Sequence, residues 1–139
     1  QDVAHHMADR SVTQILVQRM CKGVGEVLIG MRRDPEIGPV VVLAGGGIFT
    51  EIYRDTVMRL APIDLQGAEE MVEALRLTQI LKGARGRPCG DLAALAKAVV
   101  AVSDLACHPD IIEAEINPVI VLPKGQGVVA VDALMKVGA

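Results

Sequence analysis

The chain has 139 residues, of which 51% are hydrophobic and 22% are charged, and its formal net charge is −3. This length and this hydrophobic share suit one domain with a core of its own, and they argue against intrinsic disorder. Aromatic residues make up only 1%, which argues against nucleic-acid recognition by base stacking on aromatic side chains. The slightly acidic balance offers no general attraction to nucleic acids or anionic membranes, so neither is expected as a partner.

The cysteines and the apolar runs bear on the cellular compartment. Cys21, Cys89 and Cys107 lie far apart and form no CxxC pair, which is typical of reduced thiols. The most apolar stretch, residues 92–106, is interrupted by polar and charged side chains, so no membrane span is expected. We therefore expect a cytoplasmic protein.

Short apolar runs separated by turn residues predict an antiparallel meander in the first part of the chain. Runs at residues 15–20 and 26–31 flank a short glycine-containing segment, which predicts a β-hairpin. A Gly/Pro turn cluster at residues 34–39 leads into a buried strand at residues 40–44. A further strand is expected at about residues 56–60.

Helical periodicity replaces the strand pattern after residue 63. Asp64 is expected to cap a first helix and Asp91 a second one. The buried stripe of the first helix consists of Ala68, Met71, Val72 and Leu75. The stripe of the second helix consists of Leu92, Leu95, Ala96, Val99, Val102 and Ala106.

The last part of the chain returns to β-structure. Apolar residues 112, 114 and 116 alternate with Glu113, Glu115 and Asn117, and a turn at residues 123–127 precedes a return strand at 128–134. The order ββββ-αα-ββ predicts an α+β fold in which two helices cover an antiparallel sheet. We expect residues 1–139 to be a single domain cut from a larger multidomain chain, with a helical or irregular lead-in at residues 1–12.

The strongest candidate site joins Glu115 and Asn117, in the phrase Glu-Ile-Asn-Pro, to Asp132. A hairpin centred near Gly125 places residue 132 opposite about residue 118, and therefore beside Asn117. Carboxylate and amide oxygens on a sheet surface suit Mg²⁺. The alternative is an ordinary solvated strand face in which Asn-Pro makes a bend, and spacing alone leaves both interpretations open.

Three other features could serve chemistry, but each has an ordinary structural alternative. The glycines at 45–47 could bring backbone amides to a phosphate or could form a bend. Arg85 and Arg87 could clamp a phosphate or carboxylate, or could lie in a solvated connection between helices. His5 and His6 lack further ligands at metal spacing, so we expect them at the surface. The sequence shows no recognisable Ser/His/Asp or Cys/His set for nucleophilic catalysis, and no catalytic residue is assigned.

Short phrases spread in order over nearly the whole chain carry a family resemblance. They are Val17-Gln18-Arg19-Met20, Gly25-Glu26, Gly46-Gly47-Ile48-Phe49, Leu81-Lys82-Gly83-Ala84-Arg85-Gly86, Glu115-Ile116-Asn117-Pro118 and Val131-Asp132-Ala133. In this series the chain resembles the C-terminal ATP-grasp subdomain of ADP-forming (NDP-forming) acyl-CoA synthetases, which are related to the β subunit of succinyl-CoA synthetase. The resemblance implies that residues 13–139 form this subdomain.

The resemblance also implies a nucleotide site with ATP and Mg²⁺ as cofactors. In such proteins the last hairpin supplies the Mg²⁺ ligands, which implies Asn117 and Asp132 here, with Glu115 close by. The nucleotide-binding residues implied by the resemblance are Gln18, Arg19, Met20, Glu26, Gly46, Gly47 and Glu51. Family members make acyl-CoA from a carboxylic acid, CoA and ATP through an acyl phosphate and a phosphohistidine.

The partners implied by the resemblance are other domains of the same enzyme. We expect the first ATP-grasp subdomain, and the CoA-binding domains with the phosphorylated histidine, to lie outside these residues, so the fragment alone should have little or no turnover. A homo-oligomer is left open. The alternative function is a regulatory module, because the same architecture is found fused to GNAT-type protein lysine acetyltransferases, where it senses ligand. A third interpretation is an α+β interaction domain without a nucleotide site.

Overall fold

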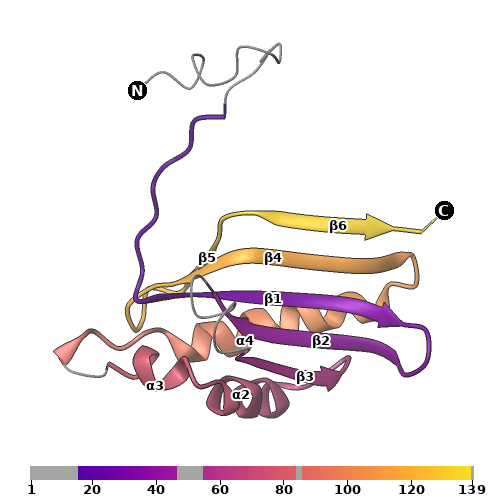
Figure 1. Cartoon of the computed structure of the whole chain (residues 1–139), viewed down its shortest axis with the longest axis horizontal. Helices are drawn as coiled ribbons and strands as arrows, with labels where there is room; N and C mark the ends of the chain where they lie inside the picture. Colours follow the sequence, from indigo (N-terminus) through magenta and orange to yellow (C-terminus); the bar gives the residue numbers. More distant parts are fainter. Residues whose placement is uncertain (1–15, 47–54, 84–85, 139) are drawn as a thin grey trace.

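The computed structural model describes residues 16–46, 55–83 and 86–138 of the chain. Within them, six strands form one sheet in the order β3-β2-β1-β4-β5, and β6 also pairs with β4 (Figure 1). The strands are β1 (Gly25–Asp34), β2 (Gly38–Gly45), β3 (Thr56–Leu60), β4 (Ile111–Val121), β5 (Val128–Ala130) and β6 (Ala133–Val137). Every pairing is antiparallel, which confirms the predicted α+β fold.

The helices lie against one face of this sheet, here called the covered face, and no helix among the described residues covers the opposite, open face (Figure 1). They are α2 (Leu65–Ala74), α3 (Thr78–Leu81), α4 (Leu92–Ser103) and the short 3₁₀ helix η3 (Asp104–Cys107). Within β1, Val27, Ile29 and Met31 are fully buried on the covered face. Strand alternation sends the side chains between them to the open face.

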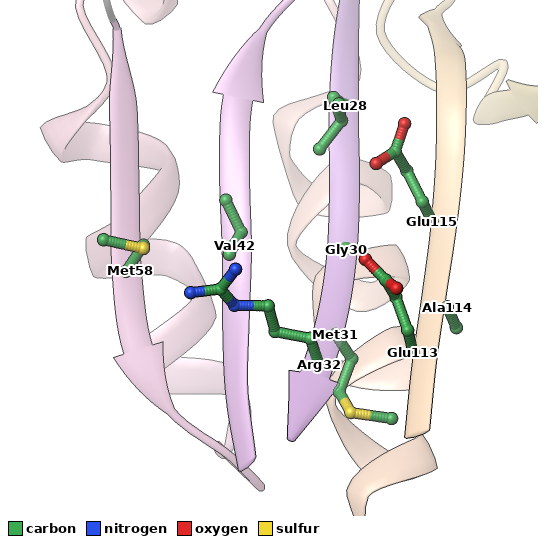
Figure 2. A pocket seen from close by; sticks show the side chains of 9 residues that line it. All are labelled: Leu28, Gly30, Met31, Arg32, Val42, Met58, Glu113, Ala114 and Glu115. Atoms are coloured by element: carbon green, nitrogen blue, oxygen red, sulfur yellow. The ribbon is translucent and has the colours of Figure 1, made fainter. Parts of the chain in front are cut away.

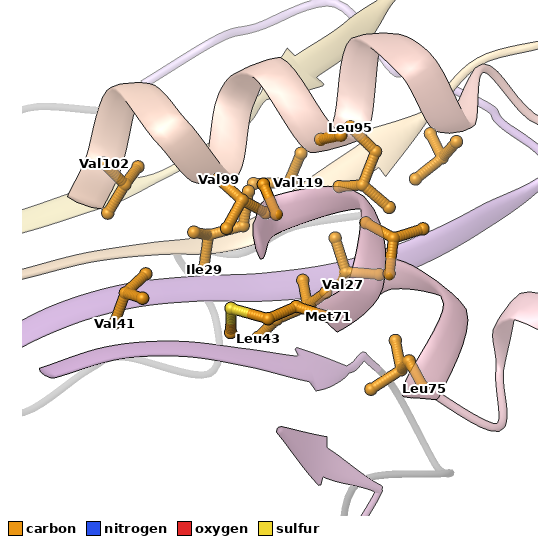
Figure 3. Close-up of a cluster of buried hydrophobic side chains, with 14 of the residues drawn as sticks. Val27, Ile29, Val41, Leu43, Met71, Leu75, Leu95, Val99, Val102 and Val119 are labelled. Carbon is orange, nitrogen blue, oxygen red and sulfur yellow. The ribbon is translucent and has the colours of Figure 1, made fainter. Parts of the chain in front are cut away.

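Side chains of the covered face and of α2 and α4 together form the hydrophobic core. Figure 3 shows Leu95 and Val99 on the side of α4 that faces the sheet, with Ile29 of β1 in the same cluster. Met71 of α2 belongs to the same cluster. Complete burial stabilises such side chains by roughly 1.5–3 kcal/mol each, so this layer holds the helices on the sheet.

Both predicted helix caps are confirmed. The Asp64 carboxylate accepts a hydrogen bond from the backbone N–H of Gly67 at 2.8 Å, and that of Asp91 accepts one from Ala94 at 3.1 Å. These bonds satisfy backbone donors that the first turn of a helix leaves without a partner. The predicted stripes are buried as expected, except that Leu92 is half-buried.

The predicted hairpin between residues 15–20 and 26–31 is wrong. Residues 16–22 form no strand, and the side chains of Leu16 and Val17 are 83% and 89% exposed. The physical reason is that both edges of β1 are taken, one by β2 and the other by β4, so no edge is left for an earlier strand. Residue 15 and the lead-in expected at residues 1–12 lie outside the described residues.

The end of the chain also differs in detail from the expectation. The single return strand predicted at residues 128–134 is two short strands, β5 and β6, separated by Val131 and Asp132. The observed order is three strands, then the helices, then three strands, close to the predicted ββββ-αα-ββ. The turn cluster at residues 34–39 is confirmed, since the Asp34 carboxylate accepts hydrogen bonds from the N–H groups of Glu36 and Ile37.

Two polar side chains tie distant segments to the covered face. The guanidinium of Arg33 donates to the carbonyl oxygens of Ala106, His108 and Ile111 at 2.7–2.9 Å, where α4 and η3 give way to β4. The buried carboxylate of Asp55 accepts hydrogen bonds from the N–H groups of Arg76 at 2.9 Å and Leu77 at 2.8 Å. Each therefore provides hydrogen bonds for backbone groups at the joins between elements.

Candidate functional site

The open face combines a polar half with an apolar half. In the register, Arg32 of β1 lies opposite Glu113 of β4, which lies opposite Lys136 of β6. One row along, Glu115 of β4 lies between Gly30 and Leu134. The apolar half, over β1, β2 and β3, consists of Leu28, Val42, Met58 and Leu60.

Glu115, Asn117 and Asp132 are brought together at the polar half, and they are named here the oxygen triad. The backbone N–H of Asn117 donates to the carbonyl oxygen of Asp132 at 3.0 Å, which confirms the predicted neighbourhood of the two residues. The side-chain amide of Asn117 donates to Oε1 of Glu115 at 3.4 Å. The triad lines a shallow hollow of about 240 Å³.

The local chain path explains why the triad forms. Glu115 and Asn117 stand two residues apart on one face of β4. After the turn, β5 runs back along β4, and the chain continues in the same direction, where Val131 donates its N–H to the carbonyl oxygen of Pro118 at 3.0 Å. Asp132 then falls in the gap between β5 and β6, where its Oδ1 accepts a hydrogen bond from the N–H of Ala133 at 2.8 Å.

The donor set fits a hard divalent cation. In the described part of the chain no three His, Cys, Asp or Glu side chains lie close enough together to hold a metal ion. The triad is not such a group, because one of its three members, Asn117, is an amide. Mg²⁺ is usually held by one or two carboxylates and completes its shell with water and phosphate oxygens. Asp132 uses only Oδ1 in a hydrogen bond, so its second carboxylate oxygen and the amide oxygen of Asn117 could serve as ligands.

A second hollow, of about 290 Å³, lies beside the triad on the open face and shares Glu115 with it. Figure 2 shows Glu113 and Glu115 reaching from β4 toward β1, while the guanidinium of Arg32 lies over β2 near Val42. Gly30, opposite Glu115, has no side chain to fill the floor. The hollow thus offers apolar walls together with one cationic group and two carboxylates.

The structure also brings together two of the residues implied in nucleotide binding. The N–H of Gly46 donates to the carbonyl oxygen of Glu26 at 2.7 Å. A Cβ at position 46 would stand 2.7 Å from that same oxygen, which is too close for any side chain. Glycine is therefore required here to let the end of β2 approach β1.

The other implied residues are not gathered at the site. Gln18, Arg19 and Met20 are exposed in the segment that precedes β1 (Figure 1). Gly47 and Glu51 lie outside the described residues, as do Arg85, His5 and His6. Arg87 is exposed in the connection between helices. Arg59 lies on the covered side of β3, where it forms an ion pair with Glu70 of α2 at 2.9 Å.

Sequence reasoning missed three residues of this region. Arg32 and Lys136 flank Glu113, one row from the triad, because β1 and β6 are both neighbours of β4. Strand alternation alone could have placed them once that pairing was known. Asp91 was expected only as a cap, but it also binds the turn before β5. The N–H groups of Gly127, Ala94 and Gly125 hold the pKa of Asp91 below its ordinary value of 3.8.

Among the described residues no helix is long and apolar enough to cross a membrane. Cys21, Cys89 and Cys107 are all free thiols.

The sequence has close relatives among ligases. Subunit beta of ADP-forming acetate–CoA ligase I from Pyrococcus furiosus is 38% identical over 136 residues, which cover 97% of this chain and 58% of that protein. ADP-forming acetate–CoA ligase I from Archaeoglobus fulgidus is 37% identical over 129 residues, which cover 92% of this chain and 19% of that protein. The chain thus spans less than two thirds of the length of either relative.

The fold is also similar to solved structures of one enzyme, the dinucleotide-forming acetyl-coenzyme A synthetase 1 of Ca. Korarchaeum cryptofilum. Its complex with coenzyme A, Ca-AMPCP and HgCl⁺ matches with a TM-score of 0.83 and 34% identity, over 97% of this chain and 58% of that one. Its complex with coenzyme A and Mg-AMPPCP matches with a TM-score of 0.77 and 35% identity, over 85% of this chain and 55% of that one.

These relatives are ligases and synthetases, and they give no support to the regulatory acetyltransferase-linked alternative. Residues 1–137 match the ATP-grasp domain family. The chain therefore belongs to the ATP-grasp family, in the branch found in ADP-forming acyl-CoA synthetases.

Proposed function

We propose that this chain is the Mg-nucleotide-binding half of an ADP-forming acyl-CoA synthetase, which makes acyl-CoA from a carboxylic acid, CoA and ATP. The observation that carries the proposal is the oxygen triad, because Asn117 and Asp132 meet through a backbone hydrogen bond of 3.0 Å on the uncovered side of the sheet. A similar protein has been solved with Mg-AMPPCP bound, which supports the same ligand class here.

In this proposal each residue of the triad has a definite task. Asp132 and Asn117 would supply oxygen ligands to Mg²⁺, and Glu115 would orient the Asn117 amide by accepting its N–H. The bound cation neutralises negative charge on the phosphate oxygens during phosphoryl transfer. The adjoining hollow, with its apolar walls and Arg32, would hold the nucleotide beside the cation.

From this hollow the nucleotide would extend toward the start of β1. Glu26 lies on the open face there, held against Gly46 by the 2.7 Å hydrogen bond. It is our candidate for the ribose hydroxyls, with Gln18, Arg19 and Met20 along the adenine and with Gly46, Gly47 and Glu51 near the phosphates. The remaining steps, through an acyl phosphate and a phosphohistidine, belong to partner domains in the proposal. The free thiols favour a cytoplasmic setting.

Calorimetry of Mg-ATP binding tests this proposal. Replacing Asp132 by Asn keeps the size of the side chain but removes one anionic ligand, and we expect the affinity to fall by about tenfold or more. Asp110→Asn is the matched control, because Asp110 precedes β4 at the end away from the turn and its side chain makes no hydrogen bond within the described residues. Equal affinities in the wild type and Asp132→Asn would contradict the assignment.

A further inference from the structure

The two oxygens of the Asp91 carboxylate bind different parts of the molecule. Oδ1 accepts the N–H of Ala94 and so caps α4 at 3.1 Å. Oδ2 accepts two further N–H groups, those of Gly125 and Gly127, both at 2.9 Å. Asp64, the corresponding cap of α2, binds only its own helix, through Gly67. Capping therefore explains one oxygen of Asp91 but not the other.

The second oxygen fixes the turn that joins β4 to β5. Gly125 and Gly127 have φ values of 83° and 86°, a conformation that favours glycine and here presents both N–H groups to one oxygen. Backbone bonds clamp the same turn, since Asp91 donates its N–H to Leu122 at 2.9 Å and Lys124 donates to Cys89 at 2.8 Å. The segment 89–91 thus holds the tip of the hairpin.

The position of Asp132 depends on this tip. Strand β5 is only three residues long, and it is followed directly by Val131 and Asp132, which bond back to Pro118 and Asn117. On the other side, all residues of β6 are exposed, so little packing holds that strand in place. The charge-assisted bonds from Asp91 anchor the turn directly before this part of the chain.

We propose that Asp91 is a positioning residue for the oxygen triad: by fixing the turn at residues 122–127, its carboxylate sets the place of Asp132 beside Asn117. The lowered pKa of Asp91 agrees with this role, because the backbone N–H groups around it stabilise its charged form. The inference rests on the proposed function insofar as it takes Asn117 and Asp132 to act as a pair.

Amide hydrogen exchange measured by NMR on the whole chain tests the proposal without any ligand. Asp91→Ser keeps one oxygen, which can still cap α4, but cannot reach the turn as well. We expect the Asn117 N–H, which bonds to Asp132, to exchange about tenfold faster, as befits the loss of hydrogen bonds to a charged group. The N–H of Val99, inside α4, should keep its exchange rate.

Two controls keep this test falsifiable. Asp64→Ala removes the other helix cap, and it should leave the exchange of Asn117 unchanged. Asp91→Asn, which keeps the size of the side chain, should act in the same direction as Asp91→Ser and replaces it if the serine variant does not fold. An unchanged Asn117 rate in these Asp91 variants, or an equal rise at Val99, would overturn the positioning role.

A titration with Mn²⁺ separates this inference from the proposed function. Mn²⁺ should broaden the amide signals of Asn117 and Asp132 in the wild type, and the midpoint should move to about tenfold higher Mn²⁺ in Asp91→Ser. Absence of broadening in the wild type would contradict the cation site itself. The exchange experiment would still decide whether Asp91 positions the two residues.

Discussion

The two faces of one sheet differ in what their side chains do. On the covered face, residues such as Ile29 and Val41 are 0% exposed and pack under α2 and α4. On the open face, Met58 and Leu134 are 63% and 70% exposed, although they are as apolar as the core. The apolar side chains of the first set are explained by their burial in the core. The second set, placed around carboxylates and an amide, is the exposed apolar surface that the nucleotide and the partner domain of our proposal would cover.

The largest effect should come from a cavity on the covered side. Leu95→Ala is expected to lower the free energy of unfolding by about 2–5 kcal/mol, because the fully buried side chain leaves a void beneath α4. Leu134→Ala on the open face should change it by less than about 0.5 kcal/mol. Urea denaturation of both variants measures these changes. Equal losses of unfolding free energy would show that the two faces contribute equally to stability.

A smaller loss is expected where a buried carboxylate holds the rim of the covered face. Asp55→Ala leaves the N–H groups of Arg76 and Leu77 without their acceptor, which should lower the free energy of unfolding by about 1–3 kcal/mol. Asp110→Ala, at an exposed position, is the control and should have no measurable effect. Thermal denaturation of both variants tests this. A wild-type Tm in Asp55→Ala would show that the carboxylate does not anchor this rim.

A still smaller effect is expected at low pH, where protonation of Asp91 should remove its stabilisation of the turn before β5. Asp91 has a pKa held below 3.8 by the N–H groups of Gly127, Ala94 and Gly125, so its stabilising contribution is present above 3.8 and is lost as the pH falls through the lower folded value. Denaturation between about pH 5 and pH 3 should therefore show a shallower loss of stability in Asp91→Ser than in the wild type. If the stability of the two proteins fell in parallel with decreasing pH, Asp91 would not make this contribution.

The smallest effect is expected at the Arg59–Glu70 ion pair between β3 and α2. Both side chains are more than 40% exposed, at 43% and 49%, so solvent screens their attraction. Arg59→Ala should cost about 0.5 kcal/mol or less, and high salt should reduce even that. A salt-independent loss as large as that of Leu95→Ala would mean that the covered face depends on charge rather than on packing.

Local signals predicted most of the covered face. The caps Asp64 and Asp91 and the buried stripes depend on residues three or four positions apart, which a sequence displays directly. Pairing over long distances is not visible in this way. Gly25 pairs with Val121, so the remote strand β4 occupies the edge of β1 that the expected hairpin with residues 15–20 would have needed. The partners of Arg33, 73 to 78 residues away, were hidden for the same reason.

The open face was predicted in part. Asn117 and Asp132 could be placed together because a single short hairpin joins them. Arg32 and Lys136 could not, because they reach this face through two separate pairings with β4. The roles assigned to Gln18, Arg19 and Met20 depend on the family resemblance and remain predictions.

The most direct test of Mg-nucleotide binding at the oxygen triad is a map of amide chemical shifts on adding Mg²⁺ and a non-hydrolysable ATP analogue to the chain. We expect the largest shifts on the open face, at Glu115, Asn117 and Asp132, and no change on the solvent side of α2 and α4. Shifts confined to the helices, or none at all at the oxygen triad, would contradict binding at this site.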